Sequence, residues 1–190
     1  MNRLTLPILA VFALVAAPAI HAEDERILEI RAKYNQTENA KLSQRTIKLD
    51  DGPETAELVK SYDANGILVK MAFTSGSDHG FGTEYYYVDR GNLYFVFQTQ
   101  GSWRFDPNGP EGTTIDTSME RRVYYAKEQV IRHLLKEASS RNPEAVAGLL
   151  KKAENKNVSN AEAEAILLSN AKRLLLVDTQ KELENFLYQE

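Results

Sequence analysis

Residues 84–98 read EYYYVDRGNLYFVFQ and decide how the middle of the chain is interpreted. Tyrosines, a short polar break and a second aromatic and aliphatic run indicate two strands, because aromatic and β-branched residues favour strands. The break contains Arg90 and Gly91, and glycine supplies the positive φ that a tight turn requires. The segment is therefore predicted to be a β-hairpin.

Two other segments have the same layout of a strand ending in tyrosine, a polar turn and a strand that opens with an aliphatic residue. They are SYDANGILVKM around Tyr62 and VYYAKEQVIRHLL around Tyr125. The last turn, Lys127-Glu128, lacks a glycine, and residues 129–136 fit a helical face as well as a strand. The repeated layout favours the strand. Together with other short β-type runs, the hairpins predict an antiparallel sheet over residues 44–136.

Helices are predicted on both sides of this sheet in the chain. Residues 23–40 are predicted to form an amphipathic helix, because Ile27, Ile30 and Tyr34 have helical spacing. Residues 142–190 are predicted to be helical, with Asn142-Pro143 opening one helix and Ser159-Asn160-Ala161-Glu162 as the capping box of another. The predicted fold class is α+β, a meandering antiparallel sheet of repeated hairpins flanked by an N-terminal helix and C-terminal helices.

The first 22 residues have the layout of a secretory signal peptide. Arg3 precedes an apolar run over residues 4–15, and small residues follow. Cleavage is predicted after Ala22, which leaves residues 23–190 as a single α+β domain in the periplasm or the outside medium, with no membrane anchor. The alternative site, Ala17-Pro18-Ala19, carries an unfavourable proline.

Composition limits the chemistry of this chain. It contains no cysteine, which excludes a lipid-modified N-terminal cysteine, disulfides and thiolate metal sites. Without Arg3, the remaining 22 basic and 27 acidic residues give a net charge of −5. This balance argues against nucleic acid or anionic lipid as a partner.

Three segments carry a resemblance to a group of uncharacterised exported bacterial proteins. They are residues 86–97 (YYVDRGNLYFVF), residues 122–125 (RVYY) with 130–132 (VIR), and residues 167–175 (LLSNAKRLL). In that group an N-terminal helix precedes hairpins of the types YYYDxxGxLxFVF and RxYYFxxGxLIR, and a C-terminal helix bears a leucine-rich segment. The resemblance covers most of residues 23–190 and implies an α+β domain with a meandering sheet. It brings no assigned activity and no catalytic residues, and Lys127-Glu128 departs from its glycine.

Motifs for catalysis or metal binding are absent from the sequence. HExxH, GxSxG and GxxxxGK[ST] do not occur, so no catalytic residue, metal or cofactor is predicted. The nearest approach to a site is Asp78, His79 and Glu84 at the glycine-rich loop 75–82, which supports an alternative hypothesis of a metal-dependent or acid/base hydrolase. Residues 106–117 fail as a calcium loop, because Glu111 and Thr117 replace the required glycine and glutamate.

The aromatic residues lead to the main functional hypothesis. Strand alternation predicts a core face with Leu93, Phe95 and Phe97. The opposite face is either covered, or Tyr86, Tyr94 and Trp103 form an open aromatic surface for a glycan, a peptide or a protein. We therefore hypothesise a non-enzymatic exported domain that binds a protein or cell-envelope partner through this face and the loop 101–118. A structural role through self-association is a further hypothesis, and the oligomeric state stays open.

Overall fold

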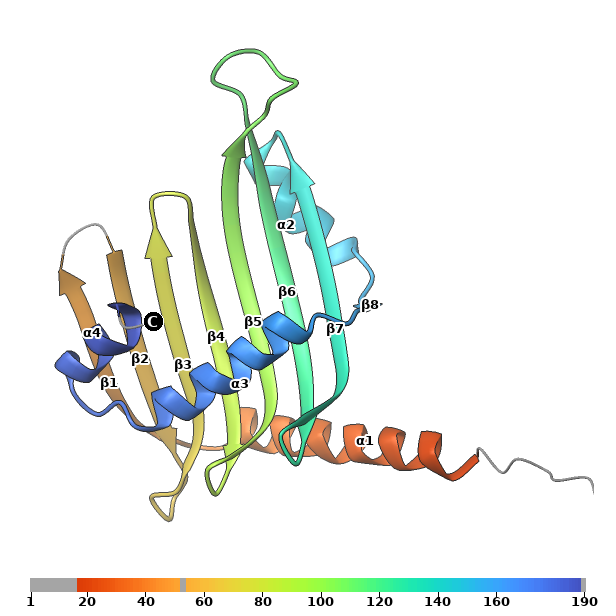
Figure 1. The fold of residues 1–190 in the computed structure, drawn as a ribbon, viewed down its shortest axis with the longest axis vertical. Helices are drawn as coiled ribbons and strands as arrows, with labels where there is room; N and C mark the ends of the chain where they lie inside the picture. The colour runs from red at the N-terminus through yellow and green to blue at the C-terminus, as the bar shows by residue number, and fades with distance from the viewer. Residues whose placement is uncertain (1–16, 52–53, 189–190) are drawn as a thin grey trace, which may run out of the picture.

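The computed structural model describes residues 17–51 and 54–188 and has the predicted α+β fold (Figure 1). Within these residues, eight antiparallel strands form one sheet in the order of the sequence. The helices are α1 (Ala17–Asn39), α2 (Pro143–Lys152), α3 (Ala161–Leu175) and α4 (Gln180–Tyr188). The strands are β1 (Ser43–Asp51), β2 (Glu54–Tyr62), β3 (Leu68–Ser77), β4 (Gly80–Asp89), β5 (Asn92–Phe105), β6 (Thr114–Ala126), β7 (Gln129–Ser140) and β8 (Lys156–Asn157).

The predicted signal peptide, 1–22, falls mostly on residues 1–16, which lie outside the described part, and α1 begins at Ala17, before the expected residue 23. Over the ranges that the structure describes, none of the helices is long and apolar enough to span a membrane.

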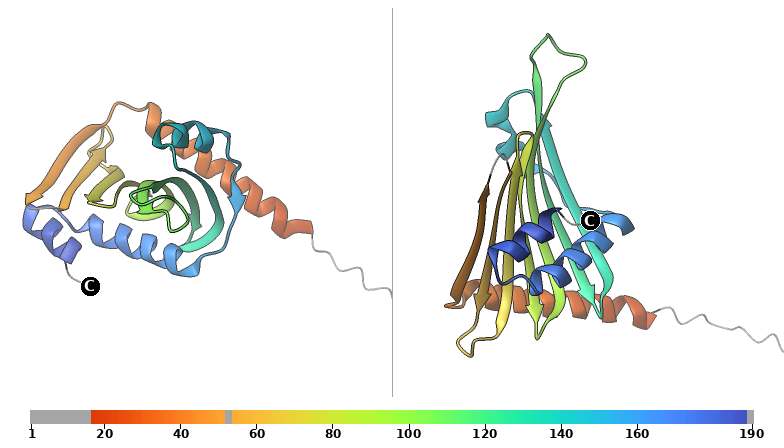
Figure 2. Two further views of the ribbon diagram at one scale, coloured as in Figure 1. Left: turned by 90° about the horizontal axis from the view of Figure 1, so that it is seen from above. Right: turned by 60° about the vertical axis from the view of Figure 1, so that its left-hand side comes forward.

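Helices cover both faces of the sheet. Figure 2 shows α1 and α2 on one side, here called the α1 face, and α3 and α4 on the other, the α3 face. The α3 face carries the larger apolar cluster, in which Leu58, Met71 and Val96 of the sheet meet Leu167 and Leu174 of α3. The cluster on the α1 face consists of Ile27, Ile30, Tyr87, Tyr94, Phe95 and Tyr124.

Each of the repeated hairpins contains one extra residue at the equivalent position of its second strand. Val69, Tyr94 and Ile131 are skipped in the pairing between neighbouring strands. Such a bulge shifts the alternation of side chains by one residue. Leu93 consequently belongs to the cluster of the α3 face while Phe95 belongs to that of the α1 face. The prediction that Leu93 shares a face with Phe95 and Phe97 is therefore wrong.

The third hairpin forms without a glycine in its turn. Lys127 and Glu128 adopt φ of 51° and 64°, close to the φ of 50° and 80° at Arg90 and Gly91. Both turns thus have the two positive φ values of the type I′ loop that matches the twist of paired strands. Residues 129–136 are part of β7, which confirms the strand that the repeat predicted.

The two glycine-rich loops are shorter than expected, because the strands on either side continue into them. β3 and β4 pair as far as Ser77 and Gly80, and β5 pairs with β6 as far as Phe105 and Thr114. The turn predicted at residues 106–109 is present, since the amide of Gly109 donates to the carbonyl oxygen of Asp106 over 3.2 Å. The hairpin of β5 and β6 consequently projects beyond the rest of the sheet (Figure 1).

The N-cap predicted for α2 is confirmed, whereas the N-cap of α3 differs from the predicted one. Asn142 caps α2, and its side chain accepts from the amide of Glu144. In α3 the N-cap is Asn160 instead of Ser159, and Glu164 instead of Glu162 accepts from the amide of Asn160. Glu164 also contacts Nδ1 of His133 at 2.7 Å. This contact with the sheet accounts for the one-residue shift of the cap.

Candidate functional site: the Trp103 groove

Two of the three residues predicted to form an open aromatic surface are buried. Tyr86 has no exposed surface (0 %) and belongs to the cluster under α3, whereas Tyr94 is 7 % exposed and belongs to the cluster under α1. The bulge at Tyr94 separates them onto opposite faces, and helices cover both faces. The open surface through Tyr86 and Tyr94 is therefore corrected, and burial raises the pKa of both hydroxyls.

Trp103 lies apart from them, near the end of the sheet beside α2. It lines a groove of about 430 Å³ on the α1 face. The groove is here called the Trp103 groove, and the residues that define it are Phe81, Trp103, Asp116, Ser118, Pro143 and Val146. Strand alternation explains the set, because Phe81 pairs with Gly101, Trp103 with Asp116, and Ser118 again with Gly101. All of these side chains consequently point to one face.

The indole of Trp103 is held by the turn between β3 and β4. Its Nε1–H donates to the carbonyl oxygen of Asp78 over 3.0 Å, and its amide donates to the carbonyl oxygen of His79 over 3.1 Å. The imidazole of His79 lies 4.6 Å from the indole, and the ring of Phe105 meets it edge-on at 5.4 Å. The orientation of the indole is thus fixed before any ligand arrives.

Phe81 and Phe105 extend the aromatic surface around the groove. They are 72 % and 65 % exposed. Phe81 lies over Gly101 of the neighbouring strand, since a Cβ at Gly101 would stand 3.1 Å from the edge of the Phe81 ring. Exposed aromatic residues gathered at one place typically mark an interaction site.

Asp116, which lines the groove, has one carboxylate oxygen without a hydrogen-bond donor among the described residues. Its Oδ2 is buried, and no residue in the described part of the chain donates a hydrogen bond to it. A buried acceptor without a donor costs about 1–3 kcal/mol.

The three residues of the hydrolase hypothesis are divided between two pockets. Asp78 lines the Trp103 groove, whereas His79 and Glu84 both line another pocket of about 520 Å³. The carboxylate of Glu84 lies on the α3 face and accepts from the hydroxyl of Tyr86. His79 packs against Trp103 instead of contacting a carboxylate. In the ranges 17–51 and 54–188, no three histidine or acidic residues are grouped as a metal site.

A polar network on the α3 face is a feature that the sequence analysis missed. Glu84, Gln98 and Arg121 are paired in a row across β4, β5 and β6. Nε2 of Gln98 donates to Glu84 over 2.9 Å, and Arg121 donates to Oε1 of Gln98 over 2.8 Å. Burial raises the pKa of Glu84 despite opposing hydrogen bonds from Tyr86 and Asn170. Glu84 and Tyr86 are two residues apart on one strand and therefore share a face. This spacing is the sequence signal that could have predicted their contact.

No protein-family model, curated protein or solved structure matches this chain. The resemblance to uncharacterised exported proteins stays a prediction.

Proposed function

We propose that this chain is an exported, non-enzymatic domain that binds a glycan of the cell envelope in the Trp103 groove. The supporting observation is the oriented indole of Trp103 beside Asp116, its partner across β5 and β6, whose Oδ2 has no hydrogen-bond donor in the described part of the chain. One wall of the groove is thus aromatic and fixed, and the other offers a strong hydrogen-bond acceptor.

A pyranose ring matches these two walls. Its C–H face is apolar and packs flat on an aromatic ring, while its hydroxyl groups are hydrogen-bond donors for a carboxylate. Binding sites typically combine apolar and aromatic walls with a few well-placed polar groups, and the groove follows this pattern. The hydroxyl of Ser118, on the same face as Trp103, adds a further polar partner along the wall.

Export and a non-enzymatic role are the remaining parts of the proposal. The layout of residues 1–22 supports export through cleavage after Ala22 to the periplasm or the outside medium. The missing motifs and the separation of Asp78 from Glu84 support binding over hydrolysis. The net charge of −5 for residues 23–190 favours a glycan over nucleic acid or anionic lipid.

The chain carries its own reporter, because Trp103 is its only tryptophan. Titrating residues 23–190 with soluble oligomers of N-acetylglucosamine is expected to shift the tryptophan emission to shorter wavelength in a saturable way. Trp103→Ala and Asp116→Asn are expected to weaken binding at least about tenfold in calorimetry. Leu176→Ala, an exposed leucine after α3, is the control and leaves the affinity unchanged.

Several outcomes contradict the proposal. One is a tryptophan emission that stays unchanged up to about 10 mM oligosaccharide. Another is an oligosaccharide affinity that is the same in Trp103→Ala, in Asp116→Asn and in the wild type. Light scattering that finds a stable dimer, lost in Phe81→Ser, would favour self-association instead. If the wild type retained a protein partner that Phe105→Ser loses, and if neither bound oligosaccharide, the ligand would be a protein instead.

A further inference from the structure

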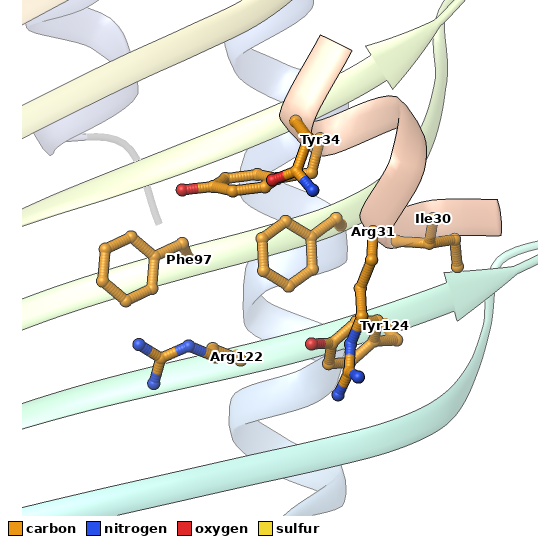
Figure 3. Close-up of a pocket in the computed structure, with 8 residues that line it drawn as sticks. Ile30, Arg31, Tyr34, Phe97, Arg122 and Tyr124 are labelled. Carbon is orange, nitrogen blue, oxygen red and sulfur yellow. The ribbon is translucent and has the colours of Figure 1, made fainter. Parts of the chain in front are cut away.

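A second, separate pocket lies between α1 and the sheet. It has a volume of about 320 Å³, and Figure 3 shows its residues converging from the helix and from β5 and β6. The helix contributes Ile30, Arg31, Tyr34 and Asn35, and the strands contribute Phe95, Phe97, Arg122 and Tyr124. It shares none of these residues with the Trp103 groove.

The floor of the pocket is aromatic and packed in place. Phe95 and Tyr124 are paired across β5 and β6, and their ring centroids are 4.9 Å apart. Tyr34 of α1 meets Phe95 edge-on at 5.4 Å. Both floor rings are buried, so the surface that a ligand would contact is formed in advance. An aromatic ring is the ligand group that such a floor accommodates best.

Two arginines, Arg31 and Arg122, line the pocket although the whole chain is acidic. Arg122 contacts Glu120 at 2.7 Å, and Lys136 contacts the same Glu120 oxygen at 3.1 Å. Burial alone would raise the pKa of Glu120, yet these two cations hold it below its ordinary value. One carboxylate therefore serves two cations here, whereas Arg132, the partner of Tyr124 on β7, pairs with two carboxylates, Glu23 and Asp24.

Arg31 adds a guanidinium on the helix side. Its guanidinium lies 6.0 Å from the ring centroid of Tyr124. Within the described part of the chain it makes no hydrogen bond or ion pair. A guanidinium presents its donors as a planar fork that fits a carboxylate. Arg31 is thus a free anion receptor at the edge of an aromatic pocket.

We propose that this pocket binds a small aromatic carboxylate. The ring would lie on the floor of Phe95 and Tyr124, and Arg31 would hold the carboxylate, with Arg122 as the second cation of the pocket. The volume is at the lower end of the range of about 300–1,000 Å³ for small-molecule sites, which limits the ligand to one or two rings. Arg122 already serves Glu120 and the side chain of Asn155, so Arg31 is the residue that confers selectivity for the anion.

The test compares naphthoate with its neutral amide, naphthamide, by calorimetry on residues 23–190. Naphthoate is expected to bind at least about tenfold more tightly than naphthamide, because only the carboxylate pairs with Arg31. Arg31→Gln is expected to remove this difference. Arg26→Gln is the matched control on the same helix, since Arg26 pairs with Glu29 and does not line the pocket.

A blocking variant locates the ligand. Asn35 is an exposed residue of α1 at the pocket, and Asn35→Trp is expected to abolish naphthoate binding while circular dichroism stays native. The proposal is overturned by equal affinity for naphthoate and naphthamide, by an unchanged affinity in Arg31→Gln or Asn35→Trp, or by the absence of saturable binding up to about 10 mM. Neither variant touches the Trp103 groove, so oligosaccharide binding there is expected to persist.

Discussion

Two glycines show how differently the same residue type acts in this chain. A Cβ at Gly80 would lie 2.7 Å from the carbonyl oxygen of Gly101 on the neighbouring strand, whereas a Cβ at Gly148 in α2 would meet nothing within 4 Å. Gly80→Ala is expected to lower the free energy of unfolding by about 1–3 kcal/mol through this clash with the backbone. Gly148→Ala is expected to raise it by about 0.5–1 kcal/mol, because glycine is unfavourable inside a helix. Urea denaturation measures both, and equal effects would contradict the packing at Gly80.

Glu84 gives a pH-dependent prediction. Burial raises its pKa in the folded chain above the ordinary value of 4.5, so the folded state binds more protons than the unfolded state over the interval between the two values. The free energy of unfolding of the wild type therefore falls as the pH rises through this interval. Glu84→Gln lacks that term, so its stability relative to the wild type is expected to increase from about pH 4 to pH 7.

Glu182 is the control with the opposite sign. Hydrogen bonds from the amide of Asp178 and from Thr179 lower its pKa, so Glu182 stabilises the fold above its unfolded pKa and loses this effect as the pH falls through the folded one. Glu182→Gln is expected to lose stability relative to the wild type as the pH rises. Parallel pH profiles for the two variants would contradict both assignments.

At this scale the sequence allowed only part of the candidate site to be predicted. Trp103 was predicted as a surface aromatic and lines the groove, but Tyr86 and Tyr94 are buried. Their faces depend on the bulge at Tyr94, and strict alternation has no means of placing a bulge. Asp116 was missed, because its importance arises from its pairing with Trp103 across two strands.

At the scale of elements, local signals predicted the hairpins and helices well, while their limits depended on tertiary contacts. The repeated layout predicted β7 even though Lys127-Glu128 lacks a glycine. The cap of α3 moved from Ser159 to Asn160, since Glu164 also contacts His133 of the sheet. Strand ends extended into the glycine-rich segments, because pairing with a neighbouring strand satisfies backbone groups that the sequence alone leaves unassigned.

The C-terminal end of α3 is attached to the sheet by a buried lysine. Lys60 of β2 is 2 % exposed, and its Nζ donates to the carbonyl oxygen of Leu175 over 3.0 Å and to Asp178 over 3.1 Å. Lys60→Met is expected to cost about 1–3 kcal/mol, because these acceptors lose their donor. Hydrogen exchange should become faster in residues 176–188, which follow this attachment.

Lys48 of β1 is the matched control for this substitution. It pairs with Glu57 at 2.6 Å on the exposed surface. Lys48→Met is expected to change the stability by less than about 1 kcal/mol, as for other exposed pairs. If both lysine variants had the same stability and the same exchange rates in residues 176–188, Lys60 would have no anchoring role.

At the scale of the molecule, one sheet serves two different apolar clusters. The cluster under α3 and α4 is the larger, and the cluster under α1 is built mainly of aromatic rings around Ile27 and Ile30. Because both clusters use opposite faces of the same strands, loss of either is expected to unfold the other. The fold class followed from the hairpin pattern, but which helix covers which face did not, since either side of the sheet offered apolar residues.

Ile30 tests whether the chain unfolds as one unit. Its side chain is buried against the sheet, whereas Leu28 on the same helix is exposed. In the chain of residues 23–190, Ile30→Ala is expected to lower the free energy of unfolding by about 2–5 kcal/mol, and Leu28→Ala by less than about 0.5 kcal/mol.

Trp103 fluorescence reports the end of the sheet and far-ultraviolet circular dichroism reports the helices. Their transitions are expected to coincide in every variant, because a single domain has no part that melts alone. A helix signal that is lost before the Trp103 signal would mean that α1, α3 or α4 unfolds separately, and the single-domain prediction would then be wrong.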